Sequence, residues 1–210
     1  MAHGLDAYSI TLYHDAFLQL AEGASDAPGA GDGARSAIAA NHRFNCLLWR
    51  EEDKARRHDV PAGDIAEGKH RIDAYNQQRN DAVEAIDEAI LAELALSHVS
   101  PASDARLSSE TAGAMIDRLS ILALKIHHMR EQTSRADAGA AHVDACAARL
   151  GRLVTQRSDL SGCLDRLLQE ARDGRAYFKV YRQFKMYNDP ALNPYRYGGA
   201  RAPQAQGRPA

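Results

Sequence analysis

The sequence predicts an all-α fold, a largely antiparallel bundle of five to six helices. Apolar residues recur at intervals of three and four along most of the chain, which is the spacing of one helix face. The chain is 45% hydrophobic but only 6% aromatic. Ala and Leu, which favour helices, supply much of the apolar content. No stretch alternates apolar and polar residues over a length that predicts a strand.

The first two predicted helices are separated by a loop. Residues 10–22 have the apolar spacing of a short amphipathic helix. Residues 23–35 are rich in Gly, Ala and Asp, which predicts a flexible loop. Ser36 can cap a second helix, which extends to about Arg57.

A long central helix follows, with Asp64 as its expected N-cap, and it continues through Leu94. Pro101 prevents further continuation because its ring and missing N–H disrupt a helix. Ser108 or Ser109 is expected to start the next helix, and a regular apolar stripe then predicts its buried face. The stripe consists of Met115, Leu119, Leu122, Ile126 and Met129.

Residues 140–172 resume the helical pattern, and Gly174 ends it. The aromatic segment that follows predicts a further helix that ends at Asn188. We therefore expect a single helical domain over residues 1–197. The tail over residues 198–210 is rich in Gly, Pro, Ala, Gln and Arg, which predicts disorder.

The charge balance argues against nucleic acid as a partner. The chain has 26 basic and 28 acidic residues, for a formal net charge of −2, and acids are interleaved with the basic residues. Nucleic-acid binding requires a basic excess or a basic patch, because phosphate contacts dominate it.

The cysteines and the apolar content predict the compartment. Cys46, Cys146 and Cys163 form no CxxC pair and lie among apolar or small residues, so we expect three reduced, buried thiols. No stretch approaches the roughly 20 apolar residues of a membrane span, and the first residues lack the pattern of a signal peptide. We expect a soluble, cytoplasmic protein without a membrane span.

Two rows of polar residues give the strongest indication of a site. On the central helix they are spaced by three and four residues, and they include Asp and Asn, which are poor helix formers. This row is Lys69, Asp73, Asn76, Asn80, Glu84 and Asp87. The preceding helix has its own row, which is His42, Asn45, Trp49, Glu52 or Asp53, and Arg56. A short loop predicts that the two helices are antiparallel neighbours, so the rows can face each other.

Two interpretations of these rows remain open. Opposed amide, carboxylate and basic groups, with one Trp for stacking, suit a sugar, a phosphate or a nucleotide. The alternative is a buried polar network that fixes the register of the helices. Under the first interpretation the ligand-binding candidates are His42, Asn45, Trp49, Glu52, Asp53, Arg56, Lys69, Asp73, Asn76, Arg79, Asn80, Glu84, Asp117, Lys125, His128, Tyr187, Asn188 and Asp189.

A metal site is a narrower version of the same hypothesis. A dinuclear carboxylate site is not expected, because its Glu-x-x-His motif occurs only once, at Glu67 and His70. A single Mg²⁺ held with a substrate phosphate is less demanding. Its candidate ligands are Glu52, Asp53, Asp73 and Glu84.

The adjacent pair His127-His128 is expected to contribute at most one side chain to any site. Neighbouring positions on a helix point about 100° apart. His128 lies nearer the Asp117 side of its helix, so it is the better candidate.

The chain also resembles a bacterial family known as domain of unknown function 4254. The resemblance rests on the polar pattern around Trp49 and on the segments IDAYNQQRND (72–81), IDRLSILALKIHHM (116–129) and QFKMYNDPALNP (183–194). It implies a helical fold and assigns no catalytic residue. Members tend to be encoded near lipopolysaccharide and glycosyltransferase genes, which implies a role around cell-surface glycans.

Two functions follow as hypotheses. The first is a protein, whether or not an enzyme, that binds or processes a phosphorylated sugar or nucleotide-sugar in bacterial surface-glycan biosynthesis. The second is a non-enzymatic adaptor of a glycosyltransferase, or a homodimeric structural protein. The adaptor hypothesis predicts paired polar residues inside the fold, no open pocket beside them and an apolar patch elsewhere on the surface.

Overall fold

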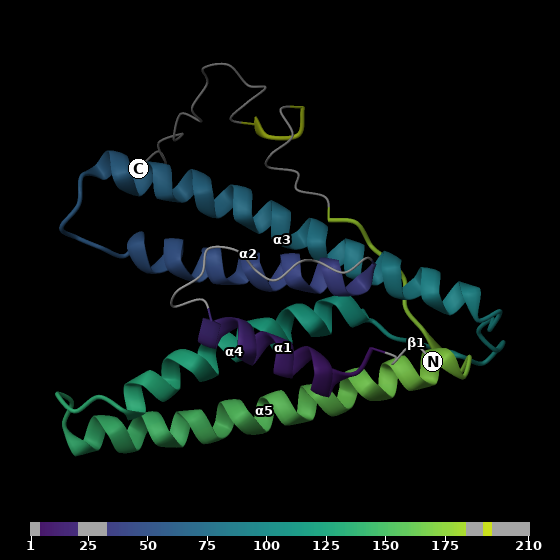
Figure 1. Ribbon diagram of the computed structural model, residues 1–210. Coiled ribbons are helices and arrows are strands. Elements are labelled where there is room, and N and C mark those ends of the chain that lie inside the picture. Colours follow the sequence, from purple (N-terminus) through teal and green to yellow (C-terminus); the bar gives the residue numbers. More distant parts are fainter. Residues whose placement is uncertain (1–4, 21–32, 184–190, 195–210) are drawn as a thin grey trace, which may run out of the picture. The chain divides into compact units, whose positions relative to one another are not determined.

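The chain is predominantly helical, as predicted, and contains five helices in its described part (Figure 1). The structure is a computed structural model that describes residues 5–20, 33–183 and 191–194. The helices are α1 (Ala7–Leu20), α2 (Ala34–Lys54), α3 (Ala62–Leu96), α4 (Ala112–Thr133) and α5 (Ala140–Arg172). Two short strands are also present, β1 (Arg106–Leu107) and β2 (Ala176–Tyr177).

The helices form two hairpins with α1 added to one of them. α2 and α3 run in opposite directions and pack along most of their length, and α4 and α5 do the same (Figure 1). α1 packs against α4 and α5, and α4 also contacts both helices of the other hairpin. α4 therefore contacts all four of the other described helices.

The main core lies where α3, α4 and α5 meet. Ile86, Ile116, Leu119, Leu164 and Leu167 are almost fully buried there. Each such side chain contributes about 1.5–3 kcal/mol by leaving water. Of the apolar stripe predicted for α4, Met115, Leu119, Leu122 and Ile126 are buried, and Met129 is half-buried.

A close contact joins α3 to the first turn of α4. The carboxylate of Asp87 accepts a hydrogen bond of 2.6 Å from the N–H of Gly113. A Cβ at Gly113 would lie 2.6 Å from the carbonyl oxygen of Val83, so no larger residue fits without movement. Thr111 is the N-cap, because its side chain accepts from the N–H of Ala114. The predicted start at Ser108 or Ser109 was therefore too early.

The starts of the other helices also differ from the predictions. α1 begins three residues early, because the Asp6 side chain accepts the Ser9 N–H at 2.7 Å and so caps it. α2 begins at Ala34 without a side-chain cap, so Ser36 lies inside the helix. α3 begins at Ala62, and Asp64 lies in its first turn instead of capping it.

The prediction of a helix after Gly174 is wrong for residues 175–183, which are not helical. Gly174 has a φ of 69°, a left-handed conformation that ends α5, and the chain then becomes extended. β2 pairs in parallel with β1, with Ala176 opposite Arg106. Ala176 and Phe178 are buried on either side of half-buried Tyr177, an alternation too short to predict a strand.

Backbone contacts divide the chain into a unit of residues 1–180 and a second unit of residues 181–210. Of the second unit, only residues 181–183 and 191–194 are described. The predicted single domain over 1–197 and the disordered tail stay predictions. Among the described helices, none combines the length and the apolar content that crossing a bilayer would require.

All three cysteines are free, but only two are buried as predicted. Cys163 is exposed on α5, which corrects the expectation of three buried thiols. Burial raises the pKa of the Cys46 thiol to about 12. Cys46 is therefore protonated at neutral pH and unsuited to act as a nucleophile.

Candidate functional site

The polar row on α2 divides into an inner and an outer part. His42 and Asn45 belong to a buried hydrogen-bonded network that faces α4. Nδ2 of Asn45 donates to Oδ1 of Asp117 at 2.8 Å and to Oγ of Ser120 at 3.0 Å. Nδ2 of Asn41 donates to the same carboxylate oxygen at 2.8 Å, and Nδ1 of His42 lies 2.7 Å from Ser120 Oγ. In this part of the row, the side chains bond to α4 and not to α3.

His42 also stacks on His14 of α1, with ring centroids 4.4 Å apart and planes 23° apart. Both rings are fully buried. Burial lowers the pKa of His42 to about 4, and it lowers the pKa of His14 well below its usual value. Both rings are therefore neutral at pH 7 and form part of the core.

The polar row on α3 is divided in the same way. Lys69 and Asp73 are exposed and lie 3.5 Å apart as a surface ion pair. Asn80 and Asp87 are buried, and Asp87 caps α4. Glu84 is half-buried. The row therefore does not line one continuous face of a site.

Residues of both rows line a smaller cleft of about 310 Å³. Its walls come from α2, α3 and α4, and its lining residues are Asn45, Leu48, Trp49, Glu52, Asp53, Arg56, Asn76, Arg79, Ile121 and Leu124. Arg56 pairs with Glu52 at 3.0 Å. Nε of Arg79 is buried and makes no hydrogen bond within the described residues.

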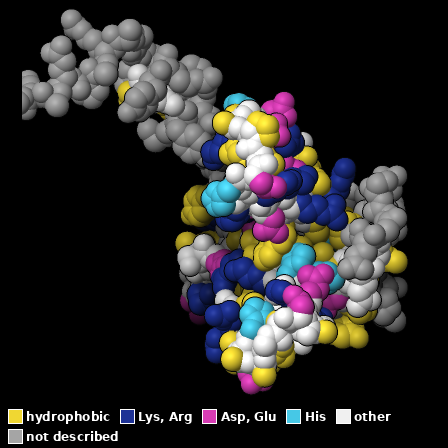
Figure 2. Space-filling view, turned by 90° about the vertical axis from the view of Figure 1, so that its left-hand side faces the viewer, with side chains coloured by type: hydrophobic (Ala, Val, Ile, Leu, Met, Phe, Trp, Pro, Cys, Tyr) yellow, Lys and Arg dark blue, Asp and Glu magenta, His cyan; other side chains and the backbone are white. Residues whose placement is uncertain are grey.

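A larger cleft of about 800 Å³ lies on the other side of Trp49 and Asp53, between α2, α4 and α5. This volume is in the range of small-molecule sites. Its lining residues are Trp49, Asp53, Lys125, His128, Met129, Glu131, Gln132, Arg149, Arg152, Leu153 and Gln156. Figure 2 views the end of the molecule at which these helix segments lie, and basic and histidine side chains gather there beside acidic ones.

Three cations of the larger cleft have no acidic partner. Lys125, Arg149 and Arg152 are exposed, and none of them forms an ion pair within the described residues. By contrast, Arg157 on the same helix as the two arginines is paired with Asp15 at 2.8 Å. The cleft therefore holds three cations without a direct ion pair next to its aromatic wall, and the carboxylates of Asp53 and Glu131 line it as well.

Trp49 and His128 form that aromatic wall. Their rings stack with centroids 4.7 Å apart and planes 15° apart. Trp49 is the only Trp of the chain, and it lines both clefts. Trp49 and Asp53 lie at the border of the two clefts, so a ligand in either cleft could contact them, and Trp49 is the aromatic one of the two.

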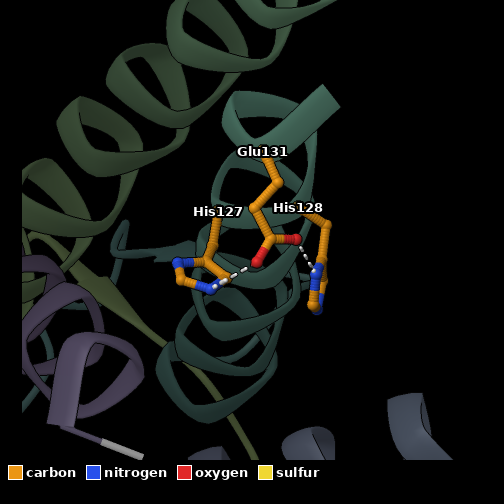
Figure 3. Close-up of side chains that lie close together, drawn as sticks. All are labelled: His127, His128 and Glu131. Carbon is orange, nitrogen blue, oxygen red and sulfur yellow. Dashed lines mark hydrogen bonds and ion pairs between the residues drawn. The ribbon is translucent and has the colours of Figure 1, made fainter. Parts of the chain in front are cut away.

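His127 and His128 converge on one carboxylate, which contradicts the expectation that only one of them could face a site (Figure 3). Nε2 of His127 lies 3.5 Å from Oε1 of Glu131, and Nδ1 of His128 lies 2.8 Å from Oε2. The two His side chains do leave α4 in different directions. The Glu131 carboxylate lies between them, and one oxygen faces each ring.

The proposed Mg²⁺ ligands do not gather in the structure. Glu52 pairs with Arg56, and Asp73 pairs with Lys69. In the described part of the chain, the one group of three potential ligands close enough for a metal is His127, His128 and Glu131. Tyr187, Asn188 and Asp189 lie outside the described residues.

Sequence reasoning missed Arg149 and Arg152 because α5 was read only for its apolar stripe. Exposed basic residues on a helix are usually solvated surface and give no signal of a site. A faint signal exists, since Arg149, Arg152 and Gln156 are spaced by three and four and flank Leu153.

The family model described as "Protein of unknown function (DUF4254)" matches residues 35–180. The chain belongs to this family. The match covers α2 to α5, so the part of the fold shared with the DUF4254 model contains every residue that lines the two clefts. α1 lies outside the matched range. Searches of the curated proteins and of the solved structures gave no significant match.

Proposed function

We propose that this DUF4254 protein binds a phosphorylated sugar or a nucleotide-sugar in the larger cleft. One observation carries the proposal. Three unpaired cations, Lys125, Arg149 and Arg152, lie in a cleft of about 800 Å³ beside the stacked rings of Trp49 and His128.

The cations suit a phosphate or diphosphate group. A guanidinium offers two parallel N–H donors to phosphate oxygens, and an ammonium adds a mobile point charge. Each hydrogen bond to a charged group contributes about 1.5–3 kcal/mol. Since the three side chains are exposed, salt will weaken their attraction for an anion.

The rest of the lining suits the ring of a sugar or base. Aromatic rings pack against apolar ring faces, and Trp49 and His128 provide such a surface. Gln132, Gln156 and Asp53 supply amide and carboxylate groups for hydroxyl groups. A simple inorganic anion would leave most of this lining unused.

The assignment to surface-glycan biosynthesis rests on the resemblance described above. The cleft supports the chemical class of ligand, which is an anion that carries a ring. We propose binding as the function and assign no reaction.

A thermal-shift panel on the untagged chain tests this proposal. We expect UDP-glucose, UMP or glucose 6-phosphate to raise the melting temperature in EDTA. A ligand at 100 times its dissociation constant adds about 2.7 kcal/mol, which corresponds to several degrees. The shift should vanish in Arg149→Ala/Arg152→Ala and persist in Arg166→Ala, an exposed Arg on α5 outside the cleft. A panel without any shift, or equal shifts in both variants, would count against the larger cleft.

The adaptor or homodimer function is the second candidate, and a different surface favours it. Tyr8, Leu12 and Leu20 on α1 are 75%, 56% and 63% exposed. Large apolar residues grouped on one exposed helix are a common feature of protein interfaces. If this surface forms a dimer, Leu12→Asp should convert the dimer to a monomer in light scattering, and a monomeric parent chain would remove the homodimer.

A further inference from the structure

The C-terminal end of α4 presents three side chains that are suited to a metal ion (Figure 3). We infer that His127, His128 and Glu131 bind a first-row transition-metal dication such as Zn²⁺. This inference goes beyond the proposed ligand site, because it requires neither the cations of the cleft nor a phosphate.

The distances are close to those of a coordinated ion. The three ligand atoms lie within 4.8 Å of one another, and the carboxylate already lies 2.8 Å from His128 Nδ1 and 3.5 Å from His127 Nε2. Bond lengths of about 2.0–2.2 Å place tetrahedral ligand atoms about 3.4 Å apart. Small side-chain rotations would therefore bring all three ligand atoms onto one ion.

The ligand types select the metal. Two imidazole nitrogens and one carboxylate suit Zn²⁺ and its neighbours Co²⁺ and Ni²⁺. Mg²⁺ prefers a set of oxygen ligands and keeps much of its water. The site therefore differs from the all-carboxylate Mg²⁺ site considered from the sequence.

The surroundings hold the ligands in place and leave part of the ion open. Trp49 stacks on the His128 ring and restricts its rotation, as supporting residues do in other metal sites. The side chains of His127, His128 and Glu131 are 25%, 36% and 47% exposed. His128 and Glu131 line the larger cleft. Three protein ligands with an open fourth position are typical of metal sites that bind water or a ligand.

Cobalt titration of the metal-stripped, untagged full-length chain tests this inference. Co²⁺ is an open-shell ion that quenches nearby indole fluorescence, and Trp49 is the only Trp and stacks directly on a proposed ligand. We expect saturable quenching with one ion per chain, and Zn²⁺ in excess should reverse it. Glu131→Gln and His127→Ala should each weaken Co²⁺ binding at least tenfold. His70→Ala, which removes an exposed His on α3, should leave it unchanged.

Two results would overturn the inference. One is quenching by Co²⁺ that does not saturate, and the other is equal quenching in Glu131→Gln and in the parent chain. Circular dichroism of each variant shows whether it is folded, and all three substitutions are at partly or fully exposed positions. Because phosphate ligands are tested in EDTA, a failure of the metal site and a failure of the proposed ligand site give different results.

Discussion

At the scale of single residues, the buried His14 makes the clearest prediction. Neither of its ring nitrogens forms a hydrogen bond within the described residues, although the ring is fully buried. A buried polar group without a partner costs about 1–3 kcal/mol. We therefore expect His14→Leu to raise the free energy of unfolding at pH 7, and urea denaturation will measure the change.

The stacked pair His14 and His42 predicts how the free energy of unfolding depends on pH. The pKa of His42 is about 4 in the folded chain and 6.5 in the unfolded chain, and the pKa of His14 is also lowered. The unfolded state therefore binds more protons between these values, and stability falls as pH drops from about 6.5 towards 4. For His42 the full loss is about 3 kcal/mol, at 1.36 kcal/mol for each pH unit.

His14→Leu removes one of the two buried rings and should flatten this dependence. His70→Leu is the matched control, since His70 is exposed. If the parent chain and His14→Leu lost the same stability between pH 7 and pH 5, the account of the buried pair would be incorrect.

The spacing of the polar residues on α2 predicted part of their arrangement in the structure. The 3–4 spacing correctly placed His42 and Asn45 on one face of α2. It could not show that this face turns to Asp117 and Ser120 instead of to α3, because the direction depends on which helix packs there. His42 and Asn45 form a buried hydrogen-bonded network between α2 and α4.

At the scale of elements, the junction of α3 and α4 depends on one glycine. In Gly113→Ala, the new methyl group would lie 2.6 Å from the carbonyl oxygen of Val83 and 2.9 Å from the Asp87 side chain. Such overpacking costs about 1–3 kcal/mol. Gly162→Ala on α5 is the control, since a methyl group there meets nothing within 4 Å. It should stabilise the helix by about 0.5–1 kcal/mol.

Urea denaturation of both glycine variants gives the test. A lower midpoint for Gly113→Ala and a higher one for Gly162→Ala are expected. Equal midpoints would mean that the close approach of α3 and α4 at Gly113 is unimportant for stability.

Periodicity predicted the helices well and the remaining elements poorly. α4 and α5 are long enough for several turns of apolar spacing to establish the pattern, so four of the five stripe residues predicted on α4 are buried and α5 spans the predicted residues 140–172. β1 and β2 contain two residues each, and their pairing joins segments some 70 residues apart in sequence, as Arg106 lies opposite Ala176. A two-residue pattern has no measurable period, and the pairing is non-local.

At the scale of the whole molecule, charge is unevenly distributed. The net charge of −2 is almost neutral, yet Lys125, Arg149 and Arg152 gather in one cleft and form no ion pair within the described residues, although Asp53 and Glu131 also line this cleft. Composition averages over the surface, and only the packing of α4 against α5 reveals this cluster. The sequence identified Trp49, Asp53, Lys125 and His128 as candidates, and the structure adds the two arginines.

The fluorescence of Trp49 can show whether the larger cleft binds a phosphorylated, ring-bearing ligand, because Trp49 is the only Trp and lines this cleft. UDP-glucose is titrated into the untagged chain in EDTA, at low and at high salt. We expect a saturable change in emission, an affinity that falls with salt, and at least a tenfold weaker affinity in Arg149→Ala/Arg152→Ala. We also expect Arg166→Ala to bind like the parent chain. An emission that stays constant up to millimolar UDP-glucose, UMP and glucose 6-phosphate, or a double variant that binds as tightly as the parent chain, would contradict binding in the larger cleft.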